Sequence, residues 1–234
     1  MLDTAFEALK KFDWGSDLAA LNPIEDAVIA AHDKPETGQD VEKRLIAALQ
    51  GELSFDAQEY VCRKLAVIGT AAAVPALALL LVKKEISHMA RFALERIPAA
   101  EAAQALRDAL PKVTGLVKVG VISSLGGRRD AGAVTALGGL LKDGDAAVAR
   151  AAALALGAIG TAESAAVLQA ELQASGGAAM PLVDALLSCA ESLLAGNKTS
   201  DANAIYAKFA QESQPRLVRL AGTRGLLACA SKQA

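Results

Sequence analysis

The sequence predicts an all-α fold in which about five helical hairpins stack behind an N-terminal helical cap, and three observations support this prediction. The 234-residue chain is 53% hydrophobic but only 3% aromatic, and the Ala and Leu that dominate it are strong helix formers. The chain nearly repeats itself about every thirty residues, as is typical of a solenoid. Finally, no sustained alternation of apolar and polar residues indicates a sheet.

Two rows of apolar residues advance together through the repeats, at separations of 28 to 34 residues. The row at the ends of the first helices is Ile68, Ile97, Leu125 and Ile159, and the row in the second helices is Leu77, Leu106, Leu137 and Leu168. The first helices are expected to stop at Gly69, Pro98, Gly126 and Gly160. Because one amphipathic pair cannot bury its own apolar faces, neighbouring hairpins must stack to cover them.

Residues 1–55 do not share the period and are predicted to form the cap. Asn22 is a suitable N-cap for a helix that runs to a polar loop at 33–39. Another helix is expected at 40–50, with Gly51 as its left-handed C-terminal residue.

Residues 56–234 are predicted to form the repeat array, continuous with the cap as one domain. The expected hairpins are 56–68 with 70–82, 86–97 with 99–111, 114–125 with 129–142, 145–159 with 161–174, and 177–195 with 199–212. A last helix at about 215–231 has no partner and leaves an apolar side uncovered. We therefore expect either that the chain is a piece of a longer protein or that this side pairs with another molecule.

Two segments resemble a known family. DGDAAVARAAALALGAIGTAESAAVLQAEL at 143–172 is similar to the HEAT-like repeat of phycobilin lyases, with an acidic turn, an Ala-rich first helix and a terminal Leu-Gly-x-Ile-Gly. YVCRKLAVIGTAAAVPAL at 60–77 matches the same pattern. The resemblance implies a right-handed α-α superhelix of the HEAT and armadillo type, bacterial in character, that commonly serves protein–protein contact.

From this resemblance we expect a non-enzymatic scaffold that binds a protein or peptide partner on the concave face of the solenoid, and the basic residues described below favour an acidic partner. The alternative is a recognition module of a larger multidomain bacterial enzyme or secreted protein. A HEAT-like DNA glycosylase and a bilin lyase are disfavoured. The sequence pI near 5.8 lies well below the ~9 typical of nucleic-acid binders, and the one tryptophan, Trp14, lies outside the repeats. No nucleic-acid, membrane or small-molecule partner is expected.

Charge indicates where a partner would bind. Residues 1–56 carry a net charge of −7 and residues 57–234 a net charge of +5. Lysines, including Lys83 and Lys84, recur at the ends of second helices; they complement the helix dipole, but they also suggest an edge that attracts anions. The expected partner-binding residues are Gln104, Arg107, Asp108, Lys112, Arg128, Arg129, Thr135 and Lys142. Polar side chains at these positions are also explained by their ordinary exposure to solvent.

From the sequence we expect no catalytic residues and no residues that bind a metal or a cofactor. His32 and His88 are the only histidines and lack a second ligand at metal-binding spacing. The three cysteines, Cys62, Cys189 and Cys229, are expected to be buried apolar residues. Residues 1–20 lack the apolar core of a signal peptide, so a cytoplasmic location is expected, or a periplasmic one if the chain is a processed fragment.

Overall fold

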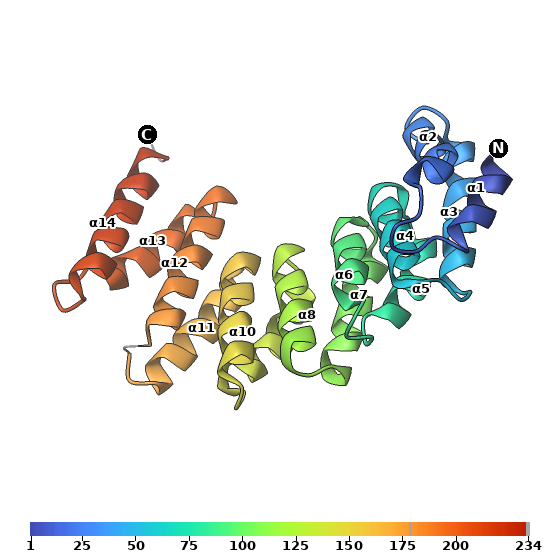
Figure 1. Cartoon of the computed structure of the whole chain (residues 1–234). Coiled ribbons are helices and arrows are strands. Elements are labelled where there is room, and N and C mark those ends of the chain that lie inside the picture. Colours follow the sequence, from blue (N-terminus) through green and yellow to red (C-terminus); the bar gives the residue numbers. More distant parts are fainter. Residues whose placement is uncertain (178, 233–234) are drawn as a thin grey trace. The chain divides into compact units, whose positions relative to one another are not determined.

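The computed structural model describes residues 1–177 and 179–232 (Figure 1). These residues form fourteen α-helices joined by turns and five short 3-10 helices, with no β-strand among them. The predicted all-α fold is therefore confirmed. The helices group into two compact units, Met1–Ser124 and Leu125–Ala234, and the boundary falls within α8 (Gly115–Gly127). Organisation of the chain as one domain with a cap at 1–55 stays a prediction.

In the first unit, three helices precede the hairpins and their packing continues into them. The helices before the hairpins are α1 (Leu2–Leu9), α2 (Asn22–Ala30) and α3 (Pro35–Leu49), with the 3-10 helix η1 (Leu18–Leu21) before α2. The hairpin helices are α4 (Phe55–Ile68) with η2 (Ala71–Ala73) and α5 (Val74–Leu80), and α6 (Ser87–Arg96) with α7 (Ala100–Ala109) and η3 (Leu110–Lys112). Helix α4 packs on α6 and α5 packs on α7. First helices thus stack on first helices and second helices on second helices.

The second unit repeats this arrangement. Its helices are η4 (Ala131–Ala133), α9 (Val134–Gly139), η5 (Leu140–Lys142), α10 (Ala146–Ile159), α11 (Ala162–Ala174), α12 (Met180–Ala195), α13 (Thr199–Phe209) and α14 (Arg216–Ser231). Helix α10 packs on α12, α9 packs on α11, and α14 packs on both α13 and α12. The hairpins predicted at 145–174 and 177–212 are therefore present with boundaries shifted by only a few residues.

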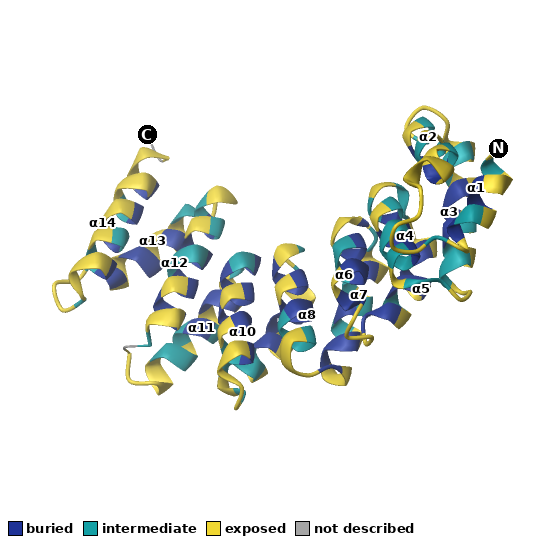
Figure 2. Cartoon of the chain, in the orientation of Figure 1, coloured by how far each residue is buried: buried dark blue, intermediate teal, exposed yellow. Residues whose placement is uncertain are grey.

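The predicted apolar rows lie in the core, except at Ile68. In the second helices Leu77, Leu106, Leu137 and Leu168 are fully buried. In the first helices Ile97, Leu125 and Ile159 are buried, whereas Ile68 is half-buried. The residues three positions before this row, Leu65, Leu94, Ile122 and Leu156, are fully buried. Figure 2 shows buried residues along the sides of helices that meet a neighbour and exposed residues on the other sides. Each buried Leu stabilises the fold by about 1.5–3 kcal/mol relative to an exposed one, and the stacked hairpins are held together mainly by this apolar contact.

Local signals explain where the best-predicted helices begin and end. Asp145 caps α10 by accepting a hydrogen bond from the Ala147 backbone N–H at 2.9 Å, and Thr161 caps α11 by accepting one from Ser164 at 3.0 Å. Between the two helices, Gly160 adopts a left-handed conformation with φ of 65°, as its place after the helix predicts.

The cap differs from its prediction in three places. Helix α3 begins at Pro35, inside the expected loop at 33–39, because proline suits the first turn of a helix. Asn22 is not the N-cap of α2; instead Asp17 caps η1, which passes directly into α2. Gly51 is not left-handed, since α3 ends with Gln50 in a right-handed helical conformation.

In the described part of the chain, every helix is too short or too polar to cross a membrane.

Candidate partner-binding site

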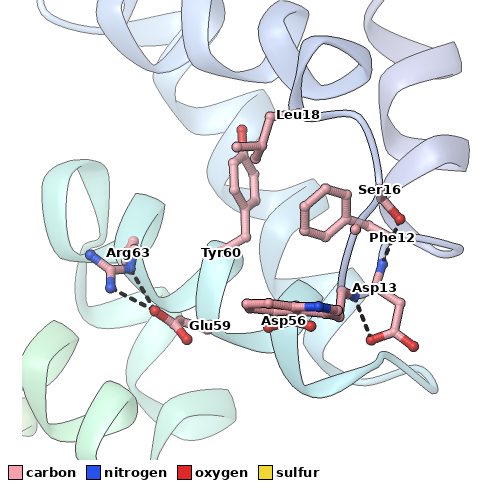
Figure 3. Close-up of a pocket in the computed structure, with 10 residues that line it drawn as sticks. Phe12, Asp13, Ser16, Leu18, Asp56, Glu59, Tyr60 and Arg63 are labelled. Carbon is pink, nitrogen blue, oxygen red and sulfur yellow. Dashed lines mark hydrogen bonds and ion pairs between the residues drawn. The ribbon is translucent and has the colours of Figure 1, made fainter.

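The first unit contains a pocket of about 400 Å³ between the segment that follows α1 and the N-terminal half of α4 (Figure 3). We call it the Trp14 pocket. Its walls combine three aromatic rings with three carboxylates and one guanidinium. The residues that line it are Phe12, Asp13, Trp14, Gly15, Ser16 and Leu18 from the segment, and Asp56, Glu59, Tyr60 and Arg63 from α4.

A tight turn at residues 13–16 presents Trp14. The Asp13 backbone N–H donates to the Ser16 hydroxyl at 3.0 Å, and the Ser16 N–H donates to the Asp13 carbonyl at 2.9 Å. The Trp14 N–H donates to the Asp13 carboxylate at 2.9 Å. Gly15 has a φ of 81°, a left-handed conformation that glycine adopts without strain. The turn therefore has a defined conformation even though its side chains are exposed.

Ser54 joins the turn to α4. Its hydroxyl donates a hydrogen bond to the Phe12 carbonyl and also accepts one from the Ala57 N–H at 3.0 Å, so that the same side chain caps α4. The Phe12 and Tyr60 rings lie 6.3 Å apart, tilted by 47°, within the range of favourable aromatic pairs. Tyr60 donates a hydrogen bond to the Leu21 carbonyl at 3.4 Å, and burial raises the pKa of its phenol. Phe12 and Tyr60 thus form the fixed wall of the pocket.

Trp14 is the unusual member of the site, because its side chain is 91% exposed. Leu18, which also lines the pocket, is exposed as well. Large apolar side chains grouped beside a pocket are typical of sites that bind another molecule, and tryptophan is enriched among the residues that contribute most to protein interfaces.

The carboxylates give the pocket a negative charge. Partial desolvation raises the pKa of Asp56, and the hydrogen bond and charge of Asp13 and the charge of Glu59 raise it further. Glu59 itself pairs with Arg63, one turn along α4, at 2.6 Å. Three carboxylates and one guanidinium leave an excess of negative charge that is not compensated within the pocket.

Aromatic faces and carboxylates together suit a cation. An ammonium or guanidinium group over an aromatic ring is attracted by about 0.5–2 kcal/mol, and hydrogen bonds from such a group to carboxylates are among the stronger ones in proteins. Residues 1–177 and 179–232 hold no cluster of three or more His, Cys, Asp or Glu side chains that would bind a metal ion. The chemistry that the pocket offers is recognition of a basic group.

Sequence reasoning did not find this pocket. The sequence distinguishes Trp14 only as a tryptophan outside the repeats. The other wall of the pocket, which contains Asp56, lies some forty residues further along the chain. A usable signal was present in Asp13-Trp14-Gly15-Ser16, since Asp, Gly and Ser are typical turn residues and a turn exposes the tryptophan among them.

Of the predicted partner-binding residues, four lie in the first unit. Gln104, Arg107 and Asp108 form a hydrogen-bonded row on α7, with Gln104 donating to Asp108 and Arg107 donating to Gln104, both at 2.7 Å. Lys112 lines a second pocket of about 400 Å³ together with Lys84 and several residues at the start of α8. Lys84 and Lys112, which follow two successive second helices, thus lie beside the same pocket.

The other four predicted residues lie in the second unit. Arg129 has a φ of 52° in the turn after α8, beside the half-buried Arg128. Thr135 is exposed on α9, and Lys142 pairs with Glu171 of α11 at 3.2 Å. Since the eight residues are divided between the two units, their membership of a single binding surface stays a prediction.

Comparison with known proteins identifies the repeats. Residues 113–177 match the family model of HEAT repeats. This match includes 143–172, one of the two segments that resemble HEAT-like repeats, and does not reach the other at 60–77. No curated protein matches the sequence.

A similar solved structure is that of human deoxyhypusine hydroxylase in complex with glycerol. The two chains are 16% identical, the alignment covers 98% of this chain and 96% of that chain, and the TM-score is 0.41. Because that protein is an enzyme, our expectation of a non-enzymatic scaffold is wrong as a deduction from repeats alone. At this identity and TM-score the similarity transfers no reaction, substrate or cofactor to the present chain.

Proposed function

We propose that this chain, whose residues 113–177 match HEAT repeats, recognises a partner protein by receiving a basic side chain of that partner in the Trp14 pocket. HEAT repeats commonly mediate protein interactions. The observation that carries the proposal is the 91% exposed Trp14 beside the carboxylates of Asp13 and Asp56.

An arginine or lysine side chain matches each part of the pocket. Its methylene groups would cover Trp14 and Leu18, which are exposed to water in the chain by itself, and burial of apolar surface contributes about 25 cal/mol per Å². Its charged end would lie near Asp13 and Asp56. Because the hydrogen bond and charge of Asp13 raise the pKa of Asp56, a neighbouring cation would stabilise the ionised form of Asp56.

Trp14 is the one tryptophan of the chain, so intrinsic fluorescence reports directly on the site. We expect a short peptide that contains arginine to change the Trp14 emission in a saturable manner. The same peptide with citrulline, which keeps the shape of arginine without its charge, should bind at least about tenfold more weakly, a loss of roughly 1.4 kcal/mol. Equal binding of the two peptides would contradict the proposal.

Substitutions of the pocket carboxylates test whether the arginine peptide binds at the Trp14 pocket. Asp13→Asn and Asp56→Asn together retain the side-chain shapes of the pocket but remove two charges, and we expect them to weaken the arginine peptide about tenfold or more. Asp26→Asn with Asp33→Asn is the matched control, since it also removes two charges and both residues are exposed carboxylates that do not line the pocket. An equal loss in both variants would indicate general charge attraction rather than a site.

A second candidate is an acidic partner segment at the pocket of Lys84 and Lys112. This pocket also has exposed apolar residues, Val82 and Leu116, so it offers both charge and apolar contact. We expect a Leu- and Glu-containing peptide to bind the chain and to lose affinity when both lysines are replaced by alanine, as measured by calorimetry. Binding that is unchanged in the double variant would remove this pocket from consideration.

A further inference from the structure

Helix α14 covers α13 with one side and leaves the other side exposed. Val218, Gly222, Gly225 and Cys229 are buried against the neighbouring helices. The two glycines permit this close packing: a Cβ at Gly222 would lie 2.5 Å from the Ala210 backbone nitrogen, and a Cβ at Gly225 would lie 2.2 Å from the Tyr206 ring. The packed side of α14 is therefore fixed, and so is the direction of its opposite side.

The opposite side of α14 is apolar and basic. Leu217, Leu220 and Leu227 are 78%, 55% and 68% exposed. Arg224 is exposed as well, follows Leu220 by four residues and precedes Leu227 by three, and it also borders a pocket of about 550 Å³ between α14 and α12 that Glu191 lines. These spacings place the arginine between two leucines on one helical face. We call this side the Leu-Arg face.

The positive charge of α14 is not balanced within the helix. The helix contains three arginines, Arg216, Arg219 and Arg224, and no acidic residue. Within the described part of the chain, none of the three takes part in an ion pair. Arg216 also lies in the first turn, at the positive end of the helix dipole, where a cation is unfavourable. A negatively charged partner would relieve both effects.

We infer that the Leu-Arg face docks on the Trp14 pocket of a second copy of this chain, with Arg224 as the side chain that enters the pocket. The inference rests on the proposed function and names the partner. Three features of the first unit match the face: exposed apolar residues in Trp14 and Leu18, the carboxylates of Asp13 and Asp56, and the net charge of −7 in residues 1–56.

The contact is head-to-tail, because it joins two different surfaces of the same chain. Such a heterologous contact leaves one Leu-Arg face and one Trp14 pocket unused in a dimer, so association continues to longer species unless a ring closes. Because the contact brings Arg224 to the carboxylates of the pocket, salt should weaken it. Sedimentation velocity of the full chain over a range of concentrations and salt concentrations would measure this association.

Two variants test the geometry of the contact. Leu220→Glu with Arg224→Glu removes the Leu-Arg face, and Trp14→Ala with Asp56→Lys removes the pocket; all four side chains are exposed or half-buried. We expect each double variant to be monomeric alone. An equimolar mixture should form one-to-one dimers and nothing larger, since one copy retains its face and the other retains its pocket. Circular dichroism melting would show that both variants are folded.

Three outcomes would overturn the inference: a wild-type chain that stays monomeric at every soluble concentration, association that persists in either double variant, and a mixture that remains monomeric. The arginine-peptide titration, carried out on the variant that lacks the Leu-Arg face, separates this inference from the proposed function. If the peptide binds but the wild-type chain does not associate, the self-docking fails while the function of the pocket stands. If the chains associate but the peptide does not bind, the pocket function fails.

Discussion

Asp56 connects the electrostatics of single residues to binding. Desolvation, the hydrogen bond and charge of Asp13, and the charge of Glu59 raise the pKa of Asp56 in the folded chain. In the Asp13→Asn variant the pKa of Asp56 should move back toward the ordinary aspartate value, because one neighbouring charge is gone. A carboxyl-detected NMR titration would measure this shift, and an Asp56 pKa that is unchanged by the substitution would contradict the proximity of the two carboxylates.

The same raised pKa makes binding depend on pH. A bound cation favours ionised Asp56, so the complex has a lower Asp56 pKa than the chain alone. We therefore expect the affinity for the arginine peptide to be constant at neutral pH and to fall as pH decreases through the pKa of Asp56 in the unbound chain. Trp14 fluorescence titrations across the acid range would test this, with Asp56→Asn as the variant that should lose this pH dependence.

The three cysteines are fully buried, as the sequence predicts. Burial and the charge of Glu59 raise the pKa of Cys62 to about 12, and burial raises that of Cys189 to about 11. Because the thiolate is the reactive form, iodoacetamide at pH 8.5 should modify the folded chain far more slowly than the chain in urea. The raised pKa values stabilise the fold below the thiol pKa of the unfolded chain, and this contribution is lost as pH rises toward 12. Equal alkylation rates in both states would contradict the burial.

At the scale of helices, glycines set how closely neighbours approach. A Cβ at Gly157 of α10 would lie 2.7 Å from the Ala185 carbonyl oxygen and 3.1 Å from the Ala185 Cα in α12. Gly157→Ala must therefore move two helices apart, and we expect it to destabilise the chain by about 1–3 kcal/mol in denaturant unfolding. Gly139→Ala is the control, because a Cβ there meets nothing within 4 Å; a similar loss in both variants would mean that α10 and α12 are not so closely packed.

The helices that sequence reasoning placed well are those whose limits depend on local signals. Helices α10 and α11 begin at Asp145 and Thr161 caps and are separated by Gly160, all of which can be read from neighbouring residues. The cap region lacks the repeat, and its local signals mislead: the polar stretch at 33–39 predicts a loop, but α3 begins at Pro35. The Trp14 pocket was missed for a different reason: it exists only when two segments far apart in the sequence fold together.

At the scale of the whole molecule, stability should vary from place to place, since each hairpin contacts chiefly its neighbours. Leu156 of α10 is fully buried, whereas Leu154 of the same helix is 52% exposed. We expect Leu156→Ala to destabilise the chain by about 2–5 kcal/mol and to speed hydrogen exchange in α10–α12 much more than in α1–α3. Leu154→Ala should change neither; a uniform rise in exchange along the chain would instead indicate one cooperative unit.

The stacking of first helices on first helices, α4 on α6 and α10 on α12, has a consequence for how such a chain can change over evolutionary time. Duplication or loss of a hairpin does not require a shared hydrophobic core to be repacked, because each hairpin presents the same kind of apolar packing surface to its neighbour. The length of the protein is thus adjustable in whole hairpins. The N-terminal turn that carries Trp14 and the surface of α14 would both survive such a change intact, with only the number of hairpins between them altered.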